Sequence, residues 1–423
     1  MSVLKHSSFP LLFFYVLLIG VIAFRVCVHP THYTTPDSIA YLKQSEQIKN
    51  TLSGELTPTT GYNITSGFTL WPTGYPLCIA LTSILTKTSV LVSSKIVNLV
   101  FLGLILLILY HWFGNKAWFT VLPFFSYGSL EVISETWSET PFIFFVFLLC
   151  FILTRDRVYR PVHIGAAVAL CLVGLFLFRY VGLIYFVPVA VIAARDFLNG
   201  RKKRAYGYFV GLAVSAIFVG LYLYNNKLSS NFFTGGERIF WGQESFSELL
   251  ILLGQGLLNE FSIARDHVFS AGWPDHLFVI MLVLQFLVIG ILVKNRKHLK
   301  IPLAAQRHVK MLLILSVGYL IAIVPLRMLM PFDNFDFRIL FPFTLPFFIA
   351  LFGLVVGCTQ KEYFDRIRRA ITVFMFLSLG VNLPKKYIVS NIKNVLTTEA
   401  KMIKPQESFE ERSETATLTT SGK

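Results

Sequence analysis

The sequence carries little charge for its length. Charged residues make up 14% of its 423 residues, whereas a soluble domain carries about 25%. Apolar runs recur from Phe9 to Leu383, and 55% of the chain is hydrophobic, which is more than one soluble core needs. Bilayers accept only helices or closed barrels, and these runs are continuous rather than alternating. We therefore predict an all-α polytopic membrane protein.

Cysteine is also scarce. The five cysteines are odd in number, lie in or beside apolar runs and form no C-x-x-C pair. This pattern lacks the spacing of a zinc site and favours buried apolar side chains. His29 and His32 have no further ligand close by in the sequence, so the spacing alone predicts no metal site.

Acidic residues are nearly missing from one set of predicted loops. If segment 77–91 lies at the membrane surface, the N-terminus and alternate loops collect 20 Lys and Arg but four Asp and Glu, while the opposite loops hold 14 acids before the C-terminal tail. Basic loops face the cytoplasm. The net charge of +15 is therefore a topological signal, and no nucleic-acid partner is predicted. Segment 77–91 becomes a juxtamembrane or re-entrant helix within a first extracytoplasmic loop, residues 29–95.

About eleven transmembrane helices are predicted within one integral membrane domain, residues 1–384. The first span follows Lys5 and His6 and is not followed by a small-x-small cleavage site, so we expect a retained signal anchor. Residues 385–423 are polar and rich in Ser, Thr, Lys and Glu, which predicts a disordered tail. The predicted spans are 9–28, 96–112, 117–131, 139–154, 162–178, 182–194, 207–225, 275–293, 309–329, 339–358 and 368–384.

Asp37 is the only aspartate before Asp156, and it stands at a predicted helix start. Thr35 suits the N-cap of that helix and Pro36 its first position. One interpretation is that Asp37 serves only the helix dipole. The other is that it is a carboxylate fixed on the water side of the membrane, where it takes a proton from an acceptor hydroxyl.

Two further segments place unusual residues on the same side of the membrane. Trp71–Pro76 reads WPTGYP, a rigid aromatic turn in which Trp71 and Tyr75 are either substrate contacts or interfacial anchors. Glu139 opens an apolar span together with Pro141, where a charge costs far less than at mid-bilayer. It is either a helix-start acid favoured by the dipole or a group that points into the mouth of the bundle.

Two arginines lie on this side as well. Arg179 and Tyr180 interrupt a long apolar stretch, either as a hairpin apex with a snorkelling arginine or as a contact for an anionic phosphate. Arg338 follows Asp333 and Asp336 at the entrance of another span. Those acids are candidate partners of Arg327 or Arg338, although a guanidinium also suits bidentate binding of a phosphate.

Taken in order, these motifs resemble those of the polytopic membrane glycosyltransferases of the GT-C superfamily. The likeness is strongest to the bacterial branch related to protein O-mannosyltransferases, to the lipid A aminoarabinose transferase and to the lipopolysaccharide-core sugar transferases of rhizobia. It covers roughly residues 9–358. The matching segments are Pro36–Ser38 with Tyr41–Leu42, Trp71–Pro76, Ser138–Pro141, Arg179–Gly182 and Arg338–Pro342.

This resemblance implies a polyprenyl-phosphate sugar donor, an extracytoplasmic active site in the bacterial inner membrane, and transfer with inversion to a glycan, lipid or protein acceptor. It implies that Asp37 is the base, that Arg179 or Arg338 holds the lipid phosphate, and that Glu139 helps to place acceptor, donor or metal. Dependence on a divalent metal ion stays open, because the first loop has no paired aspartates.

The competing class is a membrane transporter or lipid flippase, with a non-catalytic assembly factor as a third class. A transporter is expected to carry ionisable residues near mid-span and internal repeats. Here the unusual residues gather at one mouth and no repeat is visible, which favours the transferase. The sequence does not name the sugar or the acceptor.

Overall fold

The computed structural model describes residues 9–54, 71–155, 160–234, 244–267, 272–294, 297, 303–329, 334–356 and 361–384. These residues form helices and connections without a strand. Within the described residues, eight helices are long and apolar enough to cross a membrane, or nine if one bent pair is counted as a span. The chain is therefore a helical membrane protein with several spans, as predicted, while the number eleven stays a prediction. The predicted tail, residues 385–423, lies outside the described residues.

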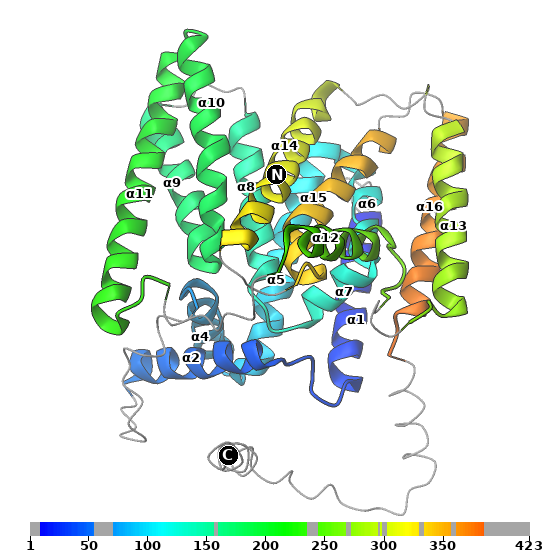
Figure 1. Ribbon diagram of the computed structural model, residues 1–423, viewed down its shortest axis with the longest axis horizontal. Helices are drawn as coiled ribbons and strands as arrows, with labels where there is room; N and C mark the ends of the chain where they lie inside the picture. The colour runs from blue at the N-terminus through cyan, green and yellow to red at the C-terminus, as the bar shows by residue number, and fades with distance from the viewer. Residues whose placement is uncertain are drawn as a thin grey trace, which may run out of the picture.

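The first loop forms two helices that lie across the lower end of the bundle in Figure 1. They are α2 (Pro36–Ser53) and α4 (Gly74–Thr86), and they follow α1 (Phe9–Val28). With 13 residues and a rise of about 1.5 Å per residue, α4 is about 20 Å long, which is too short for a hydrocarbon core of about 30 Å. The next helix, α5 (Val90–Phe113), starts inside the predicted loop 29–95.

The expected continuous span over residues 117–131 is wrong. Its place is taken by α6 (Ala117–Thr120), η2 (Leu122–Phe125) and most of α7 (Tyr127–Ser134), and η1 (Gly114–Lys116) separates them from α5. The breaks have local causes, because Gly114 has a positive φ of 56°, Pro123 removes a backbone donor, and the Ser126 side chain caps α7 by accepting from Ser129 N. The next helix, α8 (Glu139–Thr154), turns by 113° from α7.

The remaining helices cross between the two ends of the bundle, apart from α12. On one side of Figure 1 lie α9, α10 and α11, on the other side α13 and α16, with α15 between them. Of the candidate spans, α15 is the most buried and α13 the least buried. The bounds are α9 (Pro161–Phe178), η3 (Tyr180–Tyr185), α10 (Phe186–Leu198), α11 (Lys202–Ser230), α12 (Phe246–Phe261), α13 (His276–Lys294), α14 (Leu303–Leu329), α15 (Phe337–Val356) and α16 (Lys361–Val381).

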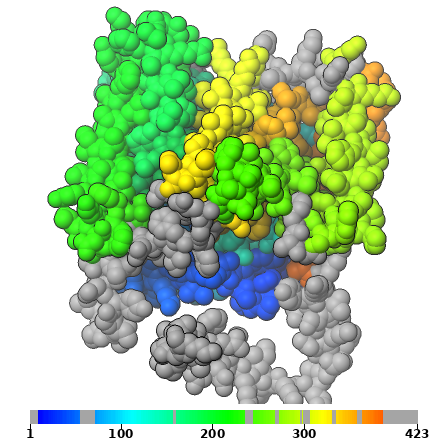
Figure 2. Space-filling model, viewed as in Figure 1, coloured from blue at the N-terminus to red at the C-terminus, as the bar shows by residue number. Residues whose placement is uncertain are grey.

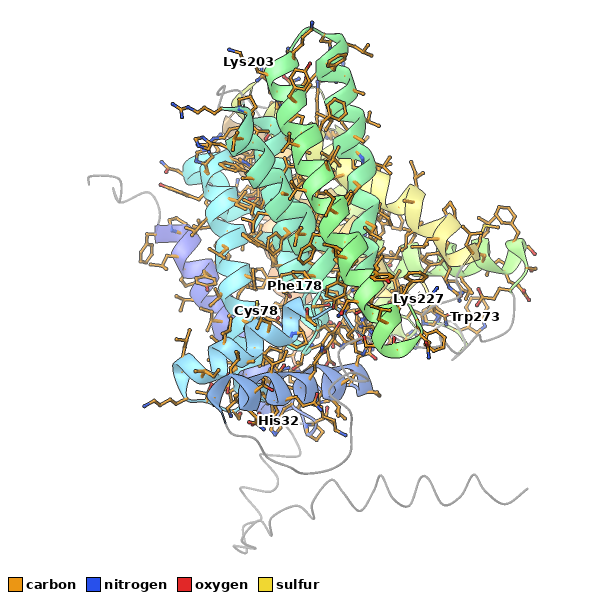
Figure 3. All side chains as sticks on the ribbon, turned by 90° about the vertical axis from the view of Figure 1, so that its left-hand side faces the viewer. His32, Cys78, Phe178, Lys203, Lys227 and Trp273 are labelled. Atoms are coloured by element: carbon orange, nitrogen blue, oxygen red, sulfur yellow. The ribbon has the colours of Figure 1, made fainter. Side chains whose placement is uncertain are left out.

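Different segments of the chain lie at the two ends of the bundle. We call the end at which α2 and α4 lie the α2 end. Figure 3 places His32, Cys78 and Phe178 toward the α2 end. Lys203, near the start of α11, lies at the opposite end. Figure 2 shows α2 along one edge of the molecule and α12 across its front. In this arrangement the starts of α8 and α15 and the end of α9 lie close together at the α2 end (Figure 1).

Candidate functional site

Four charged side chains from four different helices meet at the α2 end. Glu139 Oε1 accepts hydrogen bonds from Arg179 Nη1 and, at 2.7 Å, from Arg338 Nε. Arg338 Nη1 donates to Asp37 Oδ2. We call Asp37, Arg338, Glu139 and Arg179 the charge cluster. Its formal charges cancel, and it joins four residues that the sequence predicted from separate motifs.

Helix starts position the two acids of the charge cluster. Asp37 lies in the first turn of α2, which Thr35 caps by accepting from Ser38 N. Pro36 takes the first helical position, as the sequence predicted. Glu139 is the first residue of α8. Both carboxylates therefore also lie at the positive end of a helix dipole.

The two arginines lie at the end of one helix and the start of another. Arg179 is the C-cap of α9 and has extended backbone (φ −152°, ψ 131°), so its side chain leaves the helix axis. Arg338 lies in the first turn of α15. The side chain of Asp336 accepts from Ile339 N at 3.0 Å and so caps this helix. Arg338 pairs with Asp37 and Glu139, which the sequence did not predict. Asp333, one of its predicted partners, lies outside the described residues.

The four side chains of the charge cluster differ in their exposure to solvent. The exposed fractions of the side chains are 0% for Glu139, 10% for Arg338, 15% for Arg179 and 27% for Asp37. Asp37 is therefore the member that solvent or a ligand reaches most easily, and Glu139 is the interior anchor. The second oxygen of Glu139, Oε2, is buried and has no hydrogen-bond partner among the described residues. Such a group costs about 1–3 kcal/mol, which a water or a ligand group would relieve.

Trp137 connects the arginine and the first-loop helix. The Arg338 guanidinium carbon lies 4.8 Å from the centre of the Trp137 ring, a cation–π arrangement. The indole Nε1 of Trp137 donates to Thr35 Oγ1 at 2.9 Å. One side chain therefore supports the guanidinium and fixes the cap of α2. Sequence reasoning missed this role, although Trp137 lies between Glu135 and Glu139 in the motif that it singled out.

The aromatic residues of the first loop dock α2 on its neighbours. The Tyr41 hydroxyl lies 3.1 Å from Ser138 Oγ, and its ring centre lies 5.6 Å from that of Trp71 and 5.3 Å from that of Tyr75. Burial, followed by the charge of Glu139, raises the pKa of Tyr41 to about 12, so this phenol stays neutral. Tyr75 is fully buried and packs rather than faces a ligand, whereas Trp71 is half-buried.

A buried lysine holds the corner that leads from α7 to Glu139. Lys95, on α5, donates from Nζ to Tyr33 O at 3.0 Å, Ser134 O at 2.7 Å and Thr136 Oγ1 at 2.9 Å. These three bonds use all three ammonium donors. Sequence reasoning missed Lys95 because it assigned the residue to the first loop, whereas α5 already includes it.

Two other residues lie where helices meet. Tyr180, a predicted substrate contact, accepts from Asn226 Nδ2 at 3.2 Å and therefore joins η3 to α11. Glu260 on α12 is buried where α12 meets α7, because a Cβ added to Gly128 would lie 2.8 Å from Glu260 Oε1. Burial raises the pKa of Glu260 to about 8.

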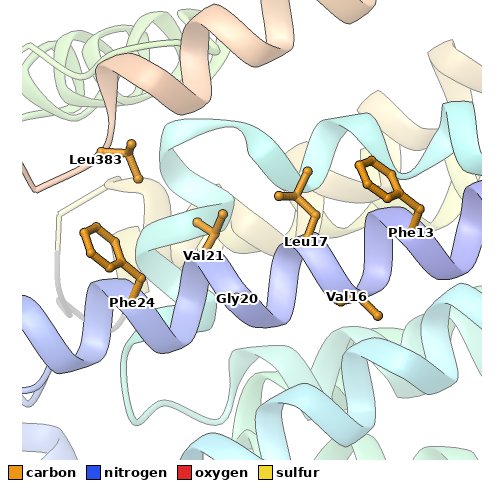
Figure 4. A pocket seen from close by; sticks show the side chains of 7 residues that line it. All are labelled: Phe13, Val16, Leu17, Gly20, Val21, Phe24 and Leu383. Atoms are coloured by element: carbon orange, nitrogen blue, oxygen red, sulfur yellow. The ribbon is translucent and has the colours of Figure 1, made fainter.

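Neither a metal site nor the apolar hollow on α1 extends the charge cluster. Among the described residues, no group of three or more His, Cys, Asp and Glu side chains is placed to hold a metal ion, so we derive no step through one. A hollow of about 430 Å³ lies on α1, lined by apolar residues and a glycine such as Phe13, Gly20 and Leu383 (Figure 4). Its lining lacks the charged groups that a phosphate or sugar needs.

Comparison of the chain with protein-family models, with curated proteins and with solved structures finds no match.

Proposed function

We propose that the protein is a membrane glycosyltransferase that moves a sugar from a polyprenyl-phosphate donor to a hydroxyl of a glycan, lipid or protein. The observation that carries this proposal is the charge cluster of Asp37, Arg338, Glu139 and Arg179 at one end of a bundle of apolar helices. The proposal includes a GT-C-like bundle of about eleven spans and an extracytoplasmic α2 end in a bacterial inner membrane.

A lipid-linked sugar suits this arrangement. Its isoprenoid chain belongs in the bilayer, and its phosphate and sugar belong at the membrane surface. Arg338 and Arg179 lie at helix ends, and both side chains keep some exposure. A guanidinium binds phosphate through two parallel N–H···O bonds. The arginines therefore supply the positive charge that stabilises the leaving phosphate as the bond to the sugar breaks.

Asp37 is suited to act as the general base. The acceptor oxygen attacks the anomeric carbon, the bond from that carbon to the phosphate oxygen breaks, and polyprenyl phosphate leaves. The acceptor proton passes to Asp37 and then to water. Asp37 is the most exposed member of the charge cluster, whereas the Glu139 side chain is fully buried and bound to two arginines. We therefore assign the proton transfer to Asp37 and the placement of the arginines to Glu139.

The transporter and flippase class is less well supported. Such proteins place ionisable residues at a site near the middle of the membrane, between repeated halves. The charge cluster instead lies at the starts of α2, α8 and α15 and the end of α9. A base beside a guanidinium at a membrane surface is chemistry that transport does not require.

The proposal is tested in cells that lack the protein. We expect them to accumulate a polyprenyl-phosphate sugar and to lose that sugar from an envelope glycan, lipid or protein, as measured by mass spectrometry. The wild-type chain and Glu46→Gln, an exposed acid on the same helix, should restore the profile, and Asp37→Asn should not. Identical profiles in cells with and without the protein would refute the transferase assignment.

A further inference from the structure

In the charge cluster, the candidate base and the proposed ligand need the same donor. Arg338 Nη1 donates to Asp37 Oδ2, while Arg338 Nε donates to Glu139 Oε1 at 2.7 Å. Two parallel bonds from Arg338 use either Nε with Nη2 or Nη1 with Nη2. A phosphate bound in this way therefore meets Nε or Nη1, the two nitrogens that now donate to carboxylates, and its negative charge lies against one of those carboxylates. One of the two acids must therefore give way when the donor binds.

The structure indicates which acid gives way. Glu139 is fully buried and is also held by Arg179, so its displacement would leave a buried charge without its partners. Asp37 is 27% exposed, so water stabilises it after it leaves the guanidinium. Arg338 itself stays in place, because the Trp137 ring lies 4.8 Å from its guanidinium carbon and Glu139 holds its Nε.

We propose that the donor phosphate displaces Asp37 from Arg338 and thereby frees Asp37 Oδ2 to accept the proton of the acceptor hydroxyl. This inference rests on the proposed function and adds an order of binding, with the lipid-linked donor before the acceptor. Without donor, Asp37 is held in its ion pair, and the base is not presented to an acceptor.

The cycle closes with atoms and charges in balance. The acceptor proton goes to Asp37 as the new glycosidic bond forms and the bond between the sugar and the phosphate breaks. Asp37 is then neutral and does not compete with polyprenyl phosphate for Arg338. After Asp37 loses the proton to water, its carboxylate binds Arg338 again, and this competition helps to release the product.

The inference makes a prediction that a purely catalytic or structural role does not make. Removing the Asp37 carboxylate removes a competitor, so a lipid phosphate should bind more tightly. The gain in affinity is the reciprocal of the fraction of Arg338 that the ion pair leaves unblocked. For a partly exposed pair that fraction is about one-fifth, so the gain is about five-fold. Loss of catalysis alone leaves this binding unchanged, and a damaged site weakens it.

The test measures binding of undecaprenyl phosphate to the purified full chain in lipid nanodiscs, without acceptor. We expect Asp37→Ala to bind about five-fold more tightly than the wild type, and Asp37→Asn to bind more tightly as well. Glu46→Gln is the matched control, because Glu46 lies on the same helix and pairs with Lys49 at the surface; its affinity should equal that of the wild type. Asp37→Asn keeps the test available if Asp37→Ala does not fold.

Two results would overturn the inference, and they are distinguishable. If the wild type binds the lipid phosphate and both Asp37 variants bind it equally or more weakly, displacement is wrong and the proposed donor stands. If neither the wild type nor the variants bind it, the donor class is wrong and the displacement falls with it.

Discussion

Glu139→Gln is the substitution for which the structure predicts the largest loss of stability. The side chain of Glu139 is fully buried, and its Oε1 accepts from both Arg179 and Arg338. Glutamine keeps the size of the side chain but removes its charge. The two arginines, with exposed fractions of 15% and 10%, are then left with Asp37 as the one carboxylate of the charge cluster.

The expected cost follows from the burial of these groups. Breaking a buried ion pair by removing one partner costs about 3–5 kcal/mol, because an uncompensated charge stays inside. An exposed pair is worth about 0.2–1 kcal/mol, so Glu46→Gln, which breaks the surface pair with Lys49, is the control. We expect Arg179→Gln added to Glu139→Gln to recover part of the loss, since it removes one unpaired cation.

The assay is reversible unfolding of the purified protein in mixed micelles, followed by helical circular dichroism. If Glu139→Gln unfolds within about 1 kcal/mol of the wild type, its charge is not compensating buried cations. In that case the interior end of the charge cluster would be hydrated, and Glu139 would no longer be its anchor.

Three further predictions concern the surroundings of the charge cluster. Lys95→Met should lower the free energy of unfolding by about 1–3 kcal/mol in the same assay, because buried acceptors lose their donor; unchanged stability would mean that Lys95 does not hold the α7–α8 corner. Glu260 has a pKa raised from 4.5 to about 8, so wild-type stability should fall as pH rises from about 4.5 toward about 8, where the unfolded chain ionises first. Glu260→Gln should remove that fall, and an equal pH profile in the variant would contradict it. In a chain without native cysteines, an impermeant maleimide on intact cells should label cysteine in place of Lys227 but not in place of Lys203, and the reverse would invert the proposed orientation.

The sequence predicted the helical membrane class because composition and continuous apolar runs depend on the bilayer alone. It also predicted local features that depend on near neighbours. The start of α2 at Pro36 after a Thr35 cap is one such feature. The first residue of α8, Glu139, is another.

The pairing within the charge cluster could not be predicted from the sequence. Asp37 and Arg338 are far apart in the chain, and only the packing of α2 against the starts of α8 and α15 brings them together. Asp336, much nearer to Arg338, was the natural candidate partner, but it caps α15. Lys95 was missed for a related reason, since its three acceptors come from the first loop and from the α7–α8 corner.

The most direct test of the central claim is release of polyprenyl phosphate from a polyprenyl-phosphate sugar by the purified protein. The donor pool is extracted from cells that lack the protein, and an envelope extract from the same cells supplies the acceptor. We predict time-dependent release by the wild type and a rate at least ~10²-fold lower for folded Asp37→Asn, the low end of the loss for a positioned general base. Release by Asp37→Asn at the wild-type rate, or none by the wild type above a protein-free control, would contradict the account.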